Sequence, residues 1–257
     1  MGALADFVHV LRKVENPVPL LLDRANLRRR SYVLRTRGGL AMEIRPQRGD
    51  RYTFYESLIM NSYLSQGQRL RPGDTVIDIG ANIGCFTVLA ARAVGPTGRV
   101  IAVEPEQSTF ESLRRNVRLN RCENVDVRRL AIGGSSGSVD LHVSGKTLFS
   151  SIYAEVGGAK AEAPLHTTGS NAQTVSMSTL EALMDDAGVE RCNYLKIDCE
   201  GAEHDIFREM DEQTAGRIDQ ITMEVHHVPG AEPEALPSVL TKLGFQQKSA
   251  SLLYAWR

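Results

Sequence analysis

The stretch from Asp74 to Glu104, DTVIDIGANIGCFTVLAARAVGPTGRVIAVE, constrains the fold of this chain most. Its first part, Thr75 to Ile79, is a nearly continuous apolar run rich in β-branched residues, which is typical of a parallel strand buried on both faces. A glycine turn from Gly80 to Gly84 follows, then helical spacing from Phe86 to Val94 and a second apolar run from Val100 to Val103. The sequence therefore predicts a strand, a turn, a helix and a second, parallel strand.

The carboxyl ends of these two strands form one edge of the predicted sheet, called the mouth below, where a nucleoside can bind. Gly80 and Gly84 let the backbone approach a ligand closely, and the helix behind them offers free N–H groups at its amino end. Glu104 closes the second strand 20 residues after Gly84, where a carboxylate can accept hydrogen bonds from two ribose hydroxyls. The first expectation is therefore a nucleoside-bearing ligand.

Strand and helix patterns alternate along most of the chain. Further strands are predicted over residues 124–130, 139–143, 174–177, 194–198, 221–226, 245–248 and 251–256. Further helices are predicted over residues 108–119, 179–187, 202–210 and 232–243. The alternation predicts an α/β fold with one doubly wound, Rossmann-like sheet that is mostly parallel and has an antiparallel closing strand.

Residues 1–49 are predicted to form an extension of helix and hairpin that packs on a domain spanning residues 50–257. The apolar residues of its first helix share one face, which suits either packing on the core or a homodimer contact. Strand-like runs at residues 31–36 and 40–45 flank Arg37-Gly38-Gly39, which is the signature of a hairpin.

Two further segments are expected to border the mouth. A helix is predicted from Arg51 to Leu64, across the mouth or along one flank. Residues 144–173 are rich in Gly, Ser, Ala and Thr and are expected to form a substrate loop, with disorder as the alternative. Tyrosines in these segments can stack on a sugar, although ordinary packing explains them as well. They are Tyr52, Tyr55, Tyr63 and Tyr153.

Charge and cysteine content exclude several classes of function. Lys and Arg number 30 and Asp and Glu number 31, and the net charge of −1 argues against nucleic acid as a partner. The Arg-rich segment at residues 24–30 is interpreted as a solvated helix face. The four cysteines lack paired spacing, so neither a zinc site nor disulfides are expected. This cysteine usage fits a reducing cytoplasm, and no apolar run reaches the roughly 20 residues of a membrane span, so a cytoplasmic location is expected.

The glycine turn departs from the dinucleotide pattern G-x-G-x-x-G and reads Asp78-Ile79-Gly80-Ala81-Asn82-Ile83-Gly84. This resembles the first motif of class I S-adenosylmethionine-dependent methyltransferases. The likeness extends to IAVEP at residues 101–105, LKIDCEGAE at 195–203 and MEVHH at 223–227. Together these motifs resemble the FkbM family over residues 50–228. Most members of that family are assigned O-methylation of sugars, polyketides or other hydroxylated metabolites.

The resemblance implies S-adenosylmethionine as the cofactor and assigns residues to it. Asp78 is expected near the methionine ammonium group, Asn82 at the amino-acid moiety and Glu104 at the ribose hydroxyls. For Asp78 and Asn82 the alternative is a turn-forming role alone. Ala131 and Ile132 are expected either beside the adenine or in plain packing. The full predicted set is Asp78, Gly80, Asn82, Gly84, Glu104, Pro105, Ala131 and Ile132.

Four titratable residues are expected to carry the chemistry. Asp198 and Glu200 lie two apart at the end of one predicted strand, and Glu224 and His226 repeat this spacing on another, so that each pair points to one side. Methyl transfer to a hydroxyl gains from a general base, and His226 is the first candidate because imidazole titrates near neutral pH. Asp198 is expected to orient His226 or to replace it. The alternative is that His226 and His227 are strand-end histidines satisfied by their neighbours.

The leading function is O-methylation of a hydroxyl on a sugar, a glycolipid or a related secondary metabolite. A divalent metal held by Asp198, Glu224 and His226 is a second mechanism, which is not favoured. Two other functions stay open: a non-catalytic cofactor-binding scaffold and, less favoured, a nicotinamide-dependent dehydrogenase. The sequence does not distinguish a free sugar, a glycolipid and a polyketide as the acceptor.

Overall fold

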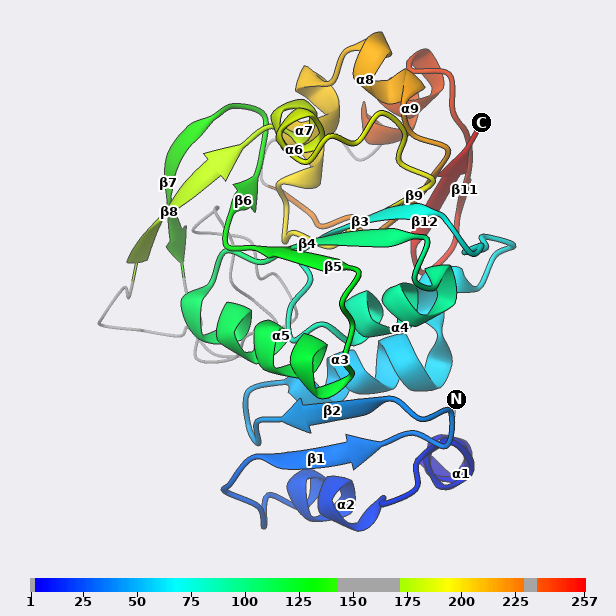
Figure 1. The fold of residues 1–257 in the computed structure, drawn as a ribbon, viewed down its shortest axis with the longest axis vertical. Helices are drawn as coiled ribbons and strands as arrows, with labels where there is room; N and C mark the ends of the chain where they lie inside the picture. Colours follow the sequence, from blue (N-terminus) through cyan, green and yellow to red (C-terminus); the bar gives the residue numbers. More distant parts are fainter. Residues whose placement is uncertain (1–2, 143–171, 229–234) are drawn as a thin grey trace.

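The computed structural model describes residues 3–142, 172–228 and 235–257, and a seven-stranded sheet forms the centre of this part (Figure 1). The strand order is β11-β12-β10-β9-β3-β4-β5. The bounds are Thr75–Ile79 (β3), Arg99–Val103 (β4), Val125–Arg128 (β5), Tyr194–Ile197 (β9), Gln220–Met223 (β10), Gln246–Ser249 (β11) and Leu253–Trp256 (β12). Within this sheet β12 runs antiparallel to both neighbours, and the other pairings are parallel. The predicted Rossmann-like sheet with an antiparallel closing strand is confirmed.

Helices cover both faces of the sheet, because successive residues of a strand point to opposite sides. One face carries Cys85–Val94 (α4) and Gln107–Leu119 (α5), and the other carries Leu180–Asp186 (α6), Glu203–Glu209 (α7), Glu212–Gly216 (α8) and Ala235–Lys242 (α9) (Figure 1). In β3, Val76 belongs to a buried cluster with α4, whereas Ile77 and Ile79 belong to one with α6, α7 and α9. Burial on both faces explains the continuous apolar run of this strand.

The turn after β3 has the positive φ angles that glycine adopts readily. Gly80 has φ +69° and Gly84 has φ +89°. A Cβ atom on Gly80 would lie 1.8 Å from the carbonyl oxygen of Asp198, and one on Gly84 would lie 2.6 Å from the side chain of Leu113. Contacts within the protein are therefore sufficient to require both glycines, and the close approach of a ligand stays a prediction.

The N-terminal residues form Ala3–Lys13 (α1), Val18–Arg24 (α2), Tyr32–Arg35 (β1) and Ala41–Ile44 (β2). β1 and β2 pair antiparallel, which confirms the predicted hairpin. Side chains of α5 bind the other edge of β2: the Oδ1 atom of Asn116 accepts from the N–H of Glu43 at 2.7 Å. Directly after α5, the Oδ1 atom of Asn120 accepts from the N–H of Ala41 at 2.9 Å. Because the hairpin shares an apolar cluster with α4, a domain boundary at residue 49 stays a prediction.

The segment predicted as one helix from Arg51 to Leu64 is divided, so the predicted continuity was wrong. It consists of Asp50–Phe54 (α3), a π-helical turn at Tyr55–Met60 (η1) and a 3₁₀ turn at Ser62–Leu64 (η2). Asn61 has φ +56°, a left-handed conformation that asparagine tolerates and that an α-helix cannot continue through. After this break Tyr63 is buried against Phe86, with ring centroids 5.6 Å apart.

A smaller sheet lies beside the main one and consists of Ala131–Ile132 (β6), Gly137–His142 (β7) and Ala172–Ser178 (β8). Residues 143–171 lie outside the described part, so the predicted substrate loop and Tyr153 are not tested. Residues 229–234 also lie outside it, and they include the start of the predicted helix at 232–243. The end of the predicted loop was placed too late, since β8 begins at Ala172.

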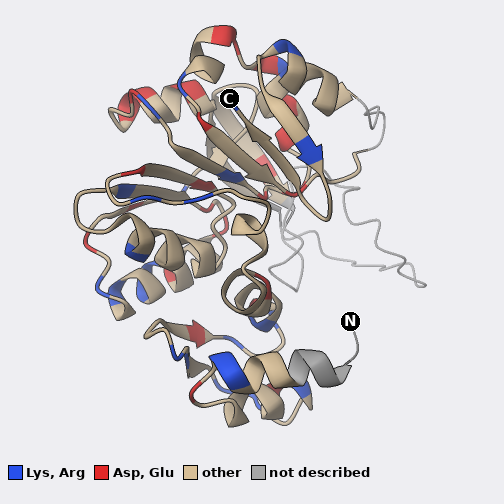
Figure 2. Cartoon of the chain, turned by 90° about the vertical axis from the view of Figure 1, so that its right-hand side faces the viewer, with Lys and Arg blue, Asp and Glu red and all other residues tan. Residues whose placement is uncertain are grey.

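Charged residues are interspersed along the chain, with acidic and basic segments on neighbouring elements (Figure 2). In the Arg-rich segment, the guanidinium group of Arg28 lies over the ring of Tyr32, 4.9 Å from its centroid. The four cysteines are free thiols. In the described ranges, no helix combines the length and the apolar character needed to cross a membrane.

Candidate active site

Two groups of polar residues meet at the carboxyl edge of the parallel strands, where ligands bind in open α/β sheets. The turn cluster lies at the ends of β3 and β4 and consists of Asp78 in β3, Asn82 in the turn after it and Glu104 directly after β4. The loop cluster follows β9 and β10 and consists of Asp198, Glu200, Glu224 and His226. β3 and β9 are paired neighbours, so the two clusters lie side by side.

In the turn cluster, backbone N–H groups hold the carboxylate of Glu104. Its Oε2 atom accepts from the N–H of Asn82 at 3.0 Å, and its Oε1 atom accepts from the N–H of Glu106 at 3.0 Å. Each oxygen keeps acceptor capacity for one more donor. Burial raises the pKa of Glu104 to about 7, against the lowering effect of the two N–H donors. The arrangement fits a ligand that presents two hydroxyl donors, as a ribose does.

Asn82 has the turn-forming role that was one of its two predicted readings. It has φ +51°, and its Oδ1 atom accepts from the N–H of Ile83 at 2.7 Å. Its own N–H also orients Glu104. A contact of Asn82 with the cofactor stays a prediction.

Asp78 is a fully buried carboxylate with one incompletely satisfied oxygen. Its Oδ2 atom accepts from the hydroxyl of Thr87 at 2.6 Å. Its Oδ1 atom accepts no hydrogen bond and lies 3.3 Å from Nζ of Lys196. Because a buried acceptor normally has a donor partner, this oxygen fits a cationic N–H donor such as the ammonium group of S-adenosylmethionine.

Lys196 joins the two clusters, and the sequence reasoning assigned it no role. Its nearly buried ammonium group donates to the carbonyl oxygen of Gly80 at 2.7 Å. It also lies 3.3 Å from Oδ1 of Asp78 and 3.7 Å from Oδ2 of Asp198. Burial lowers the pKa of Lys196, but the two carboxylates outweigh burial and raise it. A lysine in an otherwise apolar strand was the available signal, since a buried lysine requires a charged partner.

The loop cluster converges as predicted, but by a different local geometry. β9 ends at Ile197 and β10 at Met223, so the four residues lie in loops and not on extended strands. Glu200 has φ +54°, which removes the expected alternation with Asp198. The prediction that extended spacing aligns Asp198 with Glu200 was therefore wrong, whereas Glu224 and His226 do lie close together, with Oε1 and Nε2 3.9 Å apart.

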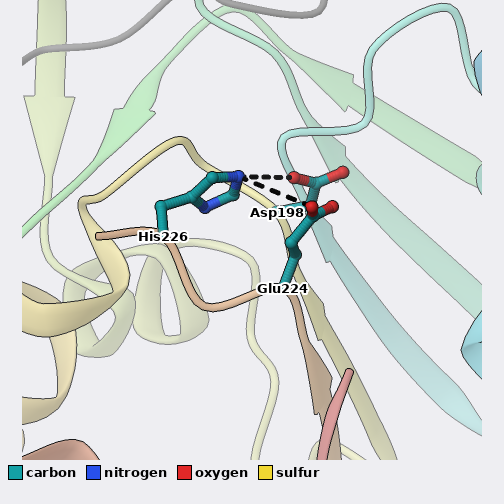
Figure 3. A group of neighbouring side chains, drawn as sticks. All are labelled: Asp198, Glu224 and His226. Atoms are coloured by element: carbon teal, nitrogen blue, oxygen red, sulfur yellow. Dashed lines mark ion pairs between the residues drawn. The ribbon is translucent and has the colours of Figure 1, made fainter. Parts of the chain in front are cut away.

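His226 lies at the centre of the loop cluster (Figure 3). Its Nε2 atom is 3.3 Å from Oε2 of Glu200, 3.9 Å from Oε1 of Glu224 and 4.0 Å from Oδ1 of Asp198. Burial opposes a charge on the ring, but the hydrogen bond to Glu203 and the surrounding carboxylates outweigh burial and raise the pKa of His226 to about 9. At neutral pH the ring is therefore a charged hydrogen-bond donor.

Carboxylates crowd this edge of the sheet. Burial raises the pKa of Glu200 to about 8, with Asp198 and Glu224 adding to the shift against the opposing charge of His226. Glu56, on η1, was not predicted to take part. Burial, with Glu224 and Asp198, raises the pKa of Glu56 to about 7. The predicted helix was expected to border the mouth, but no role was assigned to Glu56 itself.

Tyr63 is buried, which agrees with the packing alternative to stacking on a sugar, and it also contacts the loop cluster. Its hydroxyl donates to Oδ2 of Asp198 at 2.9 Å, and Nζ of Lys196 lies 5.2 Å from its ring centroid. Tyr52 is 57% exposed, and the guanidinium group of Arg51 lies over its ring. Tyr63 therefore fixes one oxygen of Asp198 and leaves the other directed at His226.

The residues expected near adenine are packed within the protein. Ala131 and Ile132 are buried and pair with Met177 and Ser178 of β8. Pro105 is half-buried directly after Glu104. Packing accounts for Ala131 and Ile132, and cofactor contacts of all three residues stay predictions.

Three side chains of the loop cluster could hold a metal ion. Among the described residues, one ligand atom each from Asp198, Glu224 and His226 lie within 4.8 Å of one another. A carboxylate and imidazole donor set of this kind suits several divalent metals. The positive charges of Lys196 and His226 already offset part of the acidic charge here.

The FkbM methyltransferase domain family matches residues 78–247, a span that contains both clusters. Among the relatives of this chain, 31-O-demethyl-FK506 methyltransferase FkbM of Streptomyces tacrolimicus is 32% identical over 205 residues, covering 72% of this chain and 78% of that protein. Methyltransferase 1 of Beauveria bassiana is 29% identical over 168 residues, covering 60% of this chain and 66% of that protein.

A solved structure has the same fold. Methyltransferase FkbM from Methylobacillus flagellatus aligns with a TM-score of 0.50 at 16% identity, and the match covers 75% of this chain and 46% of that longer one. At this identity the likeness concerns the fold alone. The domain match and the 32% identical relative extend it to the family. The chain therefore belongs to the FkbM family of S-adenosylmethionine-dependent methyltransferases.

Proposed function

We propose that this protein is an O-methyltransferase that acts on a hydroxyl group of a sugar, a glycolipid or a related secondary metabolite. The observation that carries the proposal is the loop cluster, which combines carboxylates with a charged imidazole directly beside the turn cluster. A neutral hydroxyl must lose its proton as the new bond to carbon forms, and this cluster has groups that can accept it.

The residues of the turn cluster bind the methyl donor. When bound, S-adenosylmethionine supplies an electrophilic methyl group on its sulfonium ion. The two oxygens of Glu104 would hold the ribose hydroxyls, and Oδ1 of Asp78, which has no hydrogen-bond partner in the protein, would hold the ammonium group. Lys196 keeps the ends of β3 and β9 together, so that the donor and the acceptor are held at a fixed separation.

Asp198 takes the proton of the acceptor hydroxyl in this proposal. Its backbone N–H donates to the carbonyl oxygen of Ile79 at 3.1 Å, directly before the turn. The raised pKa of His226 argues against the predicted role of that residue as the base at neutral pH. His226 instead donates a hydrogen bond within the cluster and offsets its negative charge. This corresponds to the alternative, stated from the sequence, in which Asp198 replaces His226 as the general base.

The acceptor class is supported by chemistry and by a relative. The loop cluster is acidic, and the chain as a whole has no basic surplus, which disfavours a phosphate-rich acceptor. The Streptomyces tacrolimicus relative is named for a 31-O-demethyl substrate, so its methyl group goes to oxygen. We propose the same acceptor atom for this protein.

A transfer assay tests the proposal against a scaffold without activity. The protein is titrated calorimetrically with S-adenosylhomocysteine and then incubated with radiolabelled S-adenosylmethionine and a panel of sugars, glycosides, glycolipids and polyketide alcohols. We expect label on at least one hydroxyl acceptor. Binding without transfer to any member of the panel favours the scaffold, and binding of NADH in place of adenosylhomocysteine favours a dehydrogenase.

The role of Asp198 is tested with the substitution Asp198→Asn. Asparagine keeps an oxygen for the Tyr63 hydroxyl but cannot accept a proton. We expect a loss of about 10²- to 10⁴-fold in kcat, the usual range for removal of a general base. Asp140→Asn, on an exposed strand residue, is the matched control. Full turnover by the Asp198 variant would remove this residue from the mechanism.

A further inference from the structure

Glu203, the first residue of α7, is a buried carboxylate that joins the two loops of the loop cluster. Its side chain is 0% exposed. Its Oε2 atom accepts from the N–H of Gly201 at 2.9 Å and from the thiol of Cys199 at 3.5 Å, both in the loop after β9. Its Oε1 atom accepts from the N–H of His226 at 2.6 Å, in the loop after β10. One carboxylate therefore ties together segments that are more than 20 positions apart in the sequence.

The same carboxylate also fixes the imidazole ring. Nδ1 of His226 donates to Oε1 of Glu203 at 3.2 Å. The backbone of His226 is held as well, since Nε2 of His204 lies 2.9 Å from its carbonyl oxygen. The first two residues of α7 thus bind the backbone of His226 at both its N–H and its C=O, and Glu203 additionally binds the ring.

This arrangement decides which ring nitrogen faces the loop cluster. The hydrogen bond of one imidazole nitrogen sets the direction and protonation of the other. With Nδ1 held by Glu203, Nε2 is directed at a set of three carboxylates. These are Asp198, Glu200 and Glu224, at 4.0, 3.3 and 3.9 Å.

We propose that Glu203 is a positioning residue for methyl transfer, which acts by holding His226 with Nε2 toward Asp198. The inference rests on the proposed function for its catalytic meaning, but its geometry can be tested without turnover. It also gives a physical reason for two motifs of the sequence, since the final glutamate of LKIDCEGAE binds the first histidine of MEVHH. Glu203 itself does not touch the reacting atoms.

The substitution Glu203→Gln tests the contacts of Glu203 with the two loops. An amide has one acceptor oxygen and one NH₂ donor group. In the variant, the NH₂ group must therefore face a donor, which is either the N–H of Gly201 or the N–H and Nδ1–H of His226, and the hydrogen bonds on that side are lost. The matched control is Glu209→Gln, on the same helix, where the carboxylate is 56% exposed and pairs with Arg208. Calorimetric titration with S-adenosylhomocysteine reports whether each variant folds and retains the turn cluster.

The decisive readout is the ¹⁵N spectrum of the His226 ring, assigned with the variant His226→Gln. We expect Glu203→Gln to lower the pKa of the ring by at least about one unit, a tenfold change in its protonation equilibrium. We also expect adenosylhomocysteine affinity within about twofold of wild type, because the turn cluster keeps its own hydrogen bonds. An unchanged titration of the His226 ring in a folded variant overturns the proposal.

Turnover then separates positioning from structure. With an acceptor found in the transfer assay, Glu203→Gln should lower kcat at least about tenfold and leave the KM for S-adenosylmethionine unchanged. Unchanged kcat overturns the positioning role even if the ring titration shifts. If Glu203→Gln does not fold, Glu203→Asp keeps the charge but withdraws it by one carbon, and its ring titration must shift in the same direction. Absence of transfer by the wild type contradicts the proposed function and leaves the ring titration to decide the geometry.

Discussion

The turn cluster and the loop cluster lie side by side on one sheet edge but are built differently. In the turn cluster, backbone N–H groups hold Glu104: that of Glu106 lies two positions away, that of Asn82 lies 22 positions away in the turn after β3, and the turn itself orients Asn82. In the loop cluster, side chains hold side chains across the fold, as Glu203 does with His226 and Tyr63 with Asp198. The first arrangement is made by backbone groups of the turn after β3 and of the segment after β4, whereas the second depends on side chains from η2, α7 and the loops after β9 and β10.

The two clusters also differ in the charged and polar groups that surround their carboxylates. Glu104 is surrounded by N–H dipoles, while Glu200 and Glu224 are surrounded by other carboxylates and by His226. Like charges at short range are tolerated only where cations or protons offset them. We therefore expect substitutions of residues that link the two clusters to affect folding. Substitutions within the loop cluster should affect protonation and turnover.

The largest effect is expected where the two clusters touch. Gly80→Ala would bring a Cβ atom within 1.8 Å of the Asp198 carbonyl oxygen at a φ of +69°. We expect a loss of more than about 4 kcal/mol in the free energy of unfolding, or no soluble protein, since neither backbone can withdraw. Gly67→Ala, with φ +96° and no atom within 4 Å, is the control and should lose about 1 kcal/mol. Similar denaturant midpoints for both variants would contradict the close contact.

Removal of the cation between the clusters should have the next largest effect. Lys196→Met leaves Asp78 and Asp198 without their shared ammonium group. Breaking a buried ion pair from one side costs about 3–5 kcal/mol, and urea unfolding measures this loss. Lys248→Met, on an exposed residue of β11, should change stability by less than about 0.5 kcal/mol. A Lys196 variant as stable as the control would show that the two clusters do not depend on this link.

A smaller effect is expected from the protonation of His226. Its pKa is raised from 6.5 to about 9 in the folded protein. The stabilisation is therefore complete below pH 6.5 and is lost as the pH rises through 9, and it amounts to at most about 3 kcal/mol. The difference in melting temperature between wild type and His226→Gln should shrink from pH 6 to pH 10. A difference that grows with pH would contradict the assignment.

The smallest expected effect is that of metal removal. Lys196 and His226 already offset charge in the loop cluster, so the proposed mechanism runs without a divalent ion. Enzyme treated with EDTA should therefore keep full turnover of S-adenosylmethionine without added metal. A loss that Mg²⁺ or Mn²⁺ restores would favour the second mechanism, with Asp198, Glu224 and His226 as ligands.

The same contrast explains what the sequence could predict. The apolar runs of β3 and β4 and the spacing from Gly84 to Glu104 are local features, and they led to the correct strand, turn and helix. The π-helical turn at η1 was missed because π-turns are rare and six residues are too few for their wider spacing to be distinguished from that of an α-helix. Lys196 was passed over because two of its partners, Asp78 and Gly80, come from the end of β3, more than 100 positions away.

The loop cluster was predicted for a reason that proved incomplete. Spacing of two residues aligns side chains only while the chain stays extended, and the left-handed conformation of Glu200 ends that alignment. The residues converge because Glu203 and His204 bind the loop after β10. Such contacts join distant positions, and no local pattern in a single sequence encodes them.

Calorimetric titration with S-adenosylhomocysteine, performed on Glu104→Gln and His226→Gln in parallel, tests the division between the two clusters most directly. Glu104→Gln should weaken binding at least about tenfold, because an amide cannot accept from two ribose hydroxyls and two backbone N–H groups. His226→Gln should bind within about twofold of wild type. Equal weakening by both substitutions, or none by Glu104→Gln, would contradict the account.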